Sequence, residues 1–95
     1  MTPFRPEARL ARVEGLLTTD LDQETVLMSI AAGAYYGLGG VARRIWELLA
    51  VPCSHQDLVA KLVAEFEVSP ERCAQDIEGF LEALQREGLL QVDPQ

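Results

Sequence analysis

The spacing of apolar and polar positions divides the chain into a strand-forming half and a helix-forming half. Runs rich in β-branched, aromatic and aliphatic residues cover residues 13–20, 24–30 and 34–38. The segments that separate them, 21–23 and 31–33, have the length of hairpin connections. This pattern predicts a three-stranded antiparallel meander in chain order.

The period becomes helical after Gly39-Gly40, and three helices are predicted. The first has an apolar face and ends at Pro52; that face comprises Val41, Ile45, Leu48 and Leu49. The second begins at Ser54, a predicted N-cap, and its apolar stripe comprises Leu58, Val59, Leu62, Val63 and Phe66.

The third helix opens at Ser69-Pro70, an N-cap followed by a proline at the first helical position, and closes at Gly88. Its core stripe comprises Cys73, Ile77, Phe80, Leu81 and Leu84. We expect an apolar tail, residues 89–92, to lie back on the core. The predicted fold class is therefore α+β, an N-terminal three-stranded antiparallel sheet followed by three helices.

The first twelve residues follow neither period, and they contain Pro3, Pro6 and three arginines. We expect residues 1–12 to form a flexible N-terminal arm and residues 13–95 to form a single domain. The chain has 95 residues, of which 48% are apolar and 24% charged, as in an ordinary globular domain. No apolar run approaches the roughly 18 residues of a membrane span, and no secretory signal is recognisable, so we expect a cytoplasmic protein.

The charge balance argues against nucleic-acid binding. The net charge is −7, and residues 54–95 carry nine acidic against three basic residues. Such a surface repels a phosphate backbone. A winged-helix DNA-binding protein stays an alternative on fold outline alone, although the polar face of the third helix has no Lys or Arg; it comprises Gln75, Glu78, Glu82 and Gln85.

No combination of residues indicates catalysis, a cofactor or a metal. Cys53 and Cys73 lack a CxxC partner and are interpreted as reduced structural thiols. His55, the single histidine, cannot complete a tetrahedral site with Cys53 and is interpreted as a surface residue in the first turn of a helix. The glycines at 37, 39 and 40 lack the spacing of a phosphate loop. We therefore predict a protein that is not an enzyme.

The third predicted strand, residues 34–38, is an unguarded sheet edge. It contains no Lys, Pro or inward-pointing charge, whereas the first strand is guarded by Glu14, Gly15 and Asp20. Its free N–H and C=O groups are either covered by the protein itself or pair with a strand from a partner. The residues alone favour neither alternative.

A strip of residues on the third helix lies between its core face and its polar face: Arg72, Asp76, Gly79, Ala83 and Glu87. Glycine inside a helix costs about 1 kcal/mol relative to alanine, which indicates a close approach at Gly79, either by a ligand or by the protein's own strand or helix. Asp76 lies one turn before Phe80 and is predicted to face a binding groove; the alternative is a surface ion pair with Arg72. Trp46, at the margin of the first helix's apolar face, is predicted to be partly buried and structural.

The runs GAYYGLGGVARRIWELL (residues 33–49) and CAQDIEGFLEALQREGLLQV (residues 73–92) resemble the PqqD-like family, also called the RiPP recognition element. The resemblance covers about residues 13–92. It implies a winged-helix-like fold that binds the leader peptide of a ribosomally synthesised, post-translationally modified precursor, as a fourth strand beside residues 34–38 and against the third helix. The binding residues it implies are Ala34, Tyr35, Tyr36, Gly37, Leu38, Arg72, Asp76, Gly79, Phe80 and Ala83.

Within that family, a free-standing chain of this length resembles the leader-binding protein of lasso-peptide gene clusters. That resemblance implies two partners, a cysteine leader peptidase and an ATP-dependent macrolactam synthetase. The alternative is a PqqD-type peptide chaperone for a radical enzyme in quinone-cofactor or other modified-peptide biosynthesis. The neighbouring genes distinguish the two.

Overall fold

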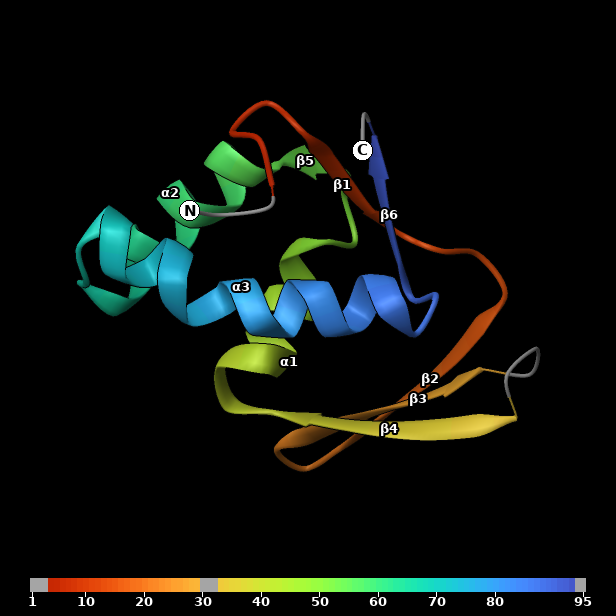
Figure 1. The fold of residues 1–95 in the computed structure, drawn as a ribbon. Coiled ribbons are helices and arrows are strands. Elements are labelled where there is room, and N and C mark those ends of the chain that lie inside the picture. The colour runs from red at the N-terminus through yellow and green to blue at the C-terminus, as the bar shows by residue number, and fades with distance from the viewer. Residues whose placement is uncertain (1–3, 30–32, 94–95) are drawn as a thin grey trace.

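The computed structural model describes residues 4–29 and 33–93, which form two small antiparallel sheets and three helices (Figure 1). The elements follow one another as β1 (Arg9–Arg12), β2 (Leu16–Leu21), β3 (Glu24–Ser29), β4 (Ala34–Gly39), α1 (Gly40–Leu48), β5 (Cys53–Ser54), α2 (His55–Phe66), α3 (Pro70–Arg86) and β6 (Leu90–Asp93). The predicted α+β class is confirmed, and a second sheet is added to it. None of the described helices is long and apolar enough to cross a membrane.

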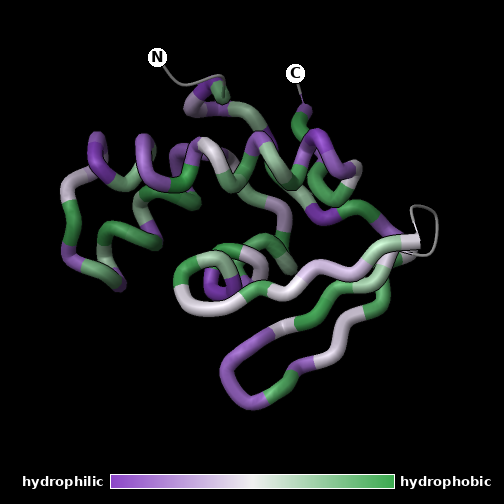
Figure 2. Tube along the Cα trace, turned by 60° about the horizontal axis from the view of Figure 1, so that its bottom comes forward, coloured by the Kyte–Doolittle hydropathy of each residue, from purple (hydrophilic) through white to green (hydrophobic). Residues whose placement is uncertain are grey.

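The predicted meander is the sheet β2-β3-β4. Its first strand begins at Leu16 rather than Val13, because Gly15 adopts a left-handed φ of 85° and the Val13 N–H donates to the Leu89 carbonyl instead. Its second strand ends at Ser29, and the predicted continuation through residue 30 and the turn at residues 31–32 lie outside the described residues. Figure 2 shows the hydrophilic turn between β2 and β3 projecting away from the helices.

The two faces of this sheet differ because successive side chains of a strand point to opposite sides. One face packs toward the helices and contributes Thr25, Leu27 and Leu38 to the interior. The other face is open, and Leu17 and Tyr35 lie on it, exposed by 53% and 71%.

The second sheet has the order β5-β1-β6, so the N-terminal segment lies at its centre. Phe4 and Leu10 are 3% and 0% exposed, and the Ala8 and Pro6 carbonyls accept hydrogen bonds from the N–H groups of His55 and Gln56. The expectation of a flexible arm is therefore wrong for residues 4–12, whereas residues 1–3 lie outside the described part. Because the segment is rich in proline and arginine, its sequence pattern did not indicate that Phe4, Ala8 and Leu10 are buried. Their burial depends on pairing with β5 and β6, which are far away in sequence.

The predicted N-caps of α2 and α3, the predicted end of α3 and the apolar tail are borne out by local interactions, whereas α1 ends at Leu48, before the predicted Pro52. The Ser54 Oγ accepts a hydrogen bond from the Asp57 N–H at 3.0 Å, and the Ser69 Oγ accepts one from the Arg72 N–H at 3.2 Å. Gly88, with a φ of 77°, follows the end of α3. The tail returns to the core as β6, where Leu89, Leu90 and Val92 are buried.

The histidine departs from its predicted place. His55 is 4% exposed, and its ring stacks on Phe4 with centroids 5.7 Å apart. The interpretation as a surface residue is wrong because the N-terminal segment covers the first turn of α2. Burial lowers the pKa of His55, since the protonated imidazole would lose its hydration there.

Candidate functional site

Strand β4 forms one edge of the sheet β2-β3-β4, at the bottom of the molecule in Figure 1. Within residues 4–29 and 33–93, no strand pairs with its outer side. An unpaired edge presents a row of N–H and C=O groups that can pair with another strand. The expectation that residues 34–38 lie at an edge is therefore confirmed for the described chain.

The turn between β2 and β3 determines which groups of β4 face outward. Leu21 and Glu24 flank a two-residue turn, so they exchange both of their backbone hydrogen bonds. The alternation of an antiparallel ladder then turns the N–H and C=O groups of Leu27 toward Tyr36, its partner on β4. It follows that Tyr35 and Gly37 direct their N–H and C=O groups to the open edge.

The side chains of β4 alternate in the same way. Leu38 is buried and Tyr36 half-buried on the helix side, whereas Tyr35 is exposed on the opposite face. A strand added to this edge would likewise send every second side chain toward the helices.

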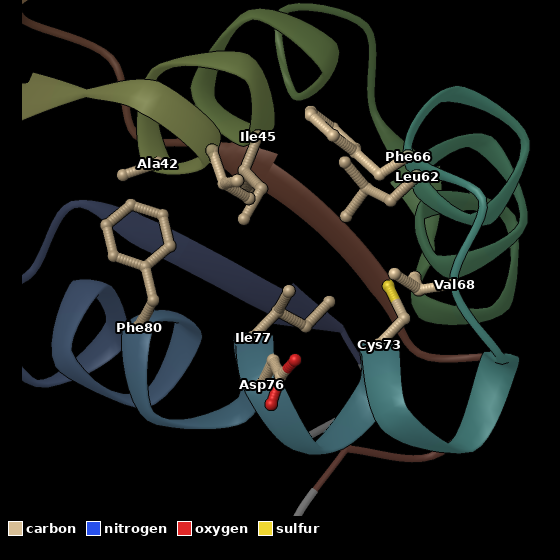
Figure 3. Close-up of a pocket in the computed structure, with 10 residues that line it drawn as sticks. Ala42, Ile45, Leu62, Phe66, Val68, Cys73, Asp76, Ile77 and Phe80 are labelled. Atoms are coloured by element: carbon tan, nitrogen blue, oxygen red, sulfur yellow. The ribbon is translucent and has the colours of Figure 1, made fainter.

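A cavity of about 520 Å³ lies between the helices (Figure 3). Its lining is apolar except for one carboxylate, and comprises Val41, Ala42, Ile45, Leu62, Phe66, Val68, Cys73, Asp76, Ile77 and Phe80. At one end, Phe80 of α3 lies opposite Ala42 of α1, close to where β4 runs into that helix. A volume of this size holds one or two large apolar side chains of a bound peptide.

An ion pair connects two of the helices that line this cavity, α1 and α2. Arg44 of α1 donates from Nε and Nη2 to the two carboxylate oxygens of Glu65 on α2, both at 2.8 Å. This bidentate hydrogen bond lowers the pKa of Glu65. Glu65 directly precedes Phe66, which lines the cavity. At an exposed site such a bond contributes little to stability, so it adds to the apolar packing of α2 against α1 and does not determine it.

The structure brings two of the α3 residues expected at the site, Asp76 and Phe80, to the cavity. Asp76 accepts from Arg72 Nε at 3.3 Å, and the two side chains are 60% and 72% exposed, so the alternative surface pair forms as well. A Cβ at Gly79 would meet nothing within 4 Å, so within the described part of the chain the predicted close approach by the protein's own strand or helix is not found. Ala83 is half-buried and does not line the cavity.

Sequence reasoning missed the contribution of α1 and of the end of α2. It placed Val41 and Phe66 in the core, but they are 46% and 44% exposed and line the cavity. Both lie at the ends of their apolar stripes, where a side chain has fewer neighbours. The cavity lies among three helices, and no β4 side chain is part of its lining, so it is not the pocket between β4 and α3 that the sequence predicted.

Cys73 lines the cavity, and Cys53 is a second buried thiol of the described chain. Burial raises the pKa values of both Cys53 and Cys73, so both thiols stay protonated near neutral pH and are poor nucleophiles. The described residues contain no group of three side chains placed to hold a metal ion. A backbone edge beside an apolar cavity has the chemistry that suits an extended peptide.

Comparisons with known proteins agree with this chemistry. The family described as coenzyme PQQ synthesis protein D (PqqD) matches residues 24–90. A solved structure described as TbiB1 in complex with the TbiA(beta) leader peptide is similar to this chain with a TM-score of 0.78 and 31% sequence identity. The match covers 85% of this chain and 94% of the TbiB1 chain. No curated protein matches the sequence significantly.

Proposed function

Since the chain belongs to the PqqD family, we propose that it binds the leader peptide of a ribosomally synthesised, post-translationally modified precursor and catalyses no reaction itself. The observation that supports this most is the open edge of β4 beside an apolar cavity, in a chain similar over most of its length to a protein solved with a leader peptide.

The leader would add to the sheet as a strand next to β4. The outward N–H and C=O groups of Tyr35 and Gly37 would pair with its backbone, which provides affinity without dependence on sequence. Leader side chains on the helix side would face Tyr36 and Leu38, and where the leader leaves β4 an apolar side chain would enter the cavity at Phe80 and Ala42. Asp76 would accept a hydrogen bond from the leader or pair with a leader cation at the rim.

The modifying enzymes are those implied by the resemblance to lasso-peptide proteins. The domain would present the bound leader to a cysteine leader peptidase and a macrolactam synthetase in the cytoplasm, where the precursor is made. A PqqD-type chaperone that serves a radical enzyme would use the same edge and cavity, so the neighbouring genes decide between these partners.

The test is a titration of the ¹⁵N-labelled protein with the synthetic leader of the precursor encoded in the same gene cluster. We expect the largest amide shifts at Tyr35 and Gly37 and along α3 from Asp76 to Phe80, with slowed hydrogen exchange of the Gly37 amide. A scrambled peptide of the same composition is the control. Shifts confined to β2, or equal shifts with the scrambled peptide, would contradict the proposal.

A further inference from the structure

The carboxylate of Glu24 lies where a side chain of Gly37 would be. Glu24 is the first residue of β3, and its cross-strand partner on β4 is Gly39. Its side chain leans along β4: a Cβ at Gly37 would be 3.1 Å from Glu24 Oε1, and a Cβ at Gly39 would be 3.6 Å from Glu24 Cγ. Gly37 and Gly39 have no side chains, so at these two positions the only side chain over the outer face of β4, among the described residues, is that of Glu24 from β3.

Within the described residues, this carboxylate forms no ion pair. Arg43, which contacts the turn between β2 and β3, donates to the Asp22 carbonyl at 3.2 Å and lies 3.9 Å from the Asp20 carboxylate. Glu24 is exposed, so its charge faces the solvent above the sheet. It belongs to no ion pair that the fold requires.

Gly37 is also one of the residues whose backbone faces the open edge. Residues directly opposite each other in an antiparallel ladder have Cβ atoms about 4.5 to 5.5 Å apart. The outer-face side chain of a peptide residue opposite Gly37 would thus lie beside the Glu24 carboxylate, with no protein side chain between them. On the same face, two residues along the strand, the exposed Tyr35 ring offers an aromatic surface.

We infer that Glu24 is a specificity-determining residue that selects a lysine or arginine at the leader position opposite Gly37. This inference rests on the proposed function, since it requires a leader strand beside β4. A carboxylate attracts either cation, and an arginine gains further from a bidentate bond and from an aromatic ring nearby. The backbone edge can pair with any extended peptide. The Glu24 carboxylate would therefore add a preference for leaders that carry a cation at this position.

The test compares Glu24→Gln with Asp22→Asn, a matched loss of one exposed negative charge in the adjacent turn. The probe is the fluorescein-labelled synthetic leader of the precursor encoded in the same gene cluster, and binding is followed by anisotropy. We expect Glu24→Gln to bind about threefold to tenfold more weakly and Asp22→Asn to change affinity less than Glu24→Gln does, with the difference shrinking in high salt. Thermal melting should confirm that both variants are folded.

A double-mutant cycle locates the leader residue. Each leader Lys or Arg is replaced in turn by Met, and each peptide is measured against both the unaltered protein and Glu24→Gln. Coupling of at least threefold at one position supports the inference. Weaker coupling at every position, a leader that binds without any Lys or Arg, or equal losses in Glu24→Gln and Asp22→Asn would overturn it while leaving leader binding intact. Failure of the unaltered protein to bind the leader would overturn the proposed function as well.

Discussion

Arg12 and Trp46 join the N-terminal strand to the first helix: the Arg12 Cζ lies 4.5 Å from the centre of the Trp46 ring, and the guanidinium donates to the Trp46 carbonyl oxygen. Trp46 is only 2% exposed, so it is more deeply buried than its marginal position on the helical wheel indicated. A buried aromatic ring with a cation on its face is a structural anchor. The contact connects β1 of one sheet to the helix that follows β4 of the other.

Replacing this anchor should unfold much of the domain. We expect Trp46→Ala to lower the free energy of unfolding by about 3 to 5 kcal/mol, because it leaves a large cavity and removes the surface under Arg12. Urea denaturation followed by circular dichroism measures this. A melting temperature that stays unchanged while leader binding is lost would instead make Trp46 a contact residue.

The buried histidine predicts a loss of stability in mild acid. Burial lowers the folded-state pKa of His55 below its unfolded value, so the unfolded chain binds the proton more readily. The free energy of unfolding should therefore fall as the pH drops through about 6.5 and level off below the folded pKa. His55→Leu should flatten the curve between pH 7 and 5.5, since His55 is the single histidine. A variant with the same slope in this range would assign the effect to other groups.

Local signals were predictable from sequence, whereas long-range pairing was not. Ser54 and Ser69 could be assigned as N-caps because a cap depends on residues within one turn. Arg9 pairs with Asp93, from the opposite end of the chain, so four residues of β1 gave no local period that would reveal the second sheet.

The same distinction between local and long-range signals applies to the candidate site. The open edge followed from strand order and from the absence of guarding residues, but the cavity did not. Whether Phe66 is buried depends on how closely α1 approaches the end of α2, and the helical period contains no information about that distance. The position of the Glu24 carboxylate over Gly37 likewise depends on register between strands, and a one-residue shift would place it on the other face.

Proline at position 37 should abolish leader binding while the sheet persists. Gly37 directs its N–H to the open edge, so proline there removes a donor that the leader would use and no bond to β3. We expect at least tenfold weaker binding. Gly37→Ala is the control, because it crowds Glu24 in the same way and keeps the N–H.

Tyr36→Pro provides a contrasting case. Its N–H points to β3, so this proline should weaken the sheet itself and lower the melting temperature. If Gly37→Pro remains folded and binds the leader with unchanged affinity, β4 is not the strand with which the leader pairs.

The cavity should contribute to binding more than to folding. Phe66 lines it and is 44% exposed, so Phe66→Ala should lower leader affinity about tenfold and cost less than about 1 kcal/mol of stability. Leu62 lines the same cavity but is 1% exposed, and Leu62→Ala should cost about 2 to 5 kcal/mol. Calorimetric titration and thermal melting of both variants separate the two effects. Equal losses of affinity and stability in Phe66→Ala would indicate that this side chain only supports the fold.

Asp76 should matter more for the leader than other acids on its helix do. Its carboxylate is the single charged group of the cavity lining, and its surface pair with Arg72 is worth at most a few tenths of a kcal/mol. If it accepts a hydrogen bond from the leader, Asp76→Asn should weaken binding by about 1.5 kcal/mol, roughly tenfold, with little change in stability. Glu82→Gln is the matched control, because it removes one exposed negative charge from the same helix away from the cavity. Equal losses in the two variants would show that the effect is general attraction to an acidic domain and that Asp76 does not contact the leader.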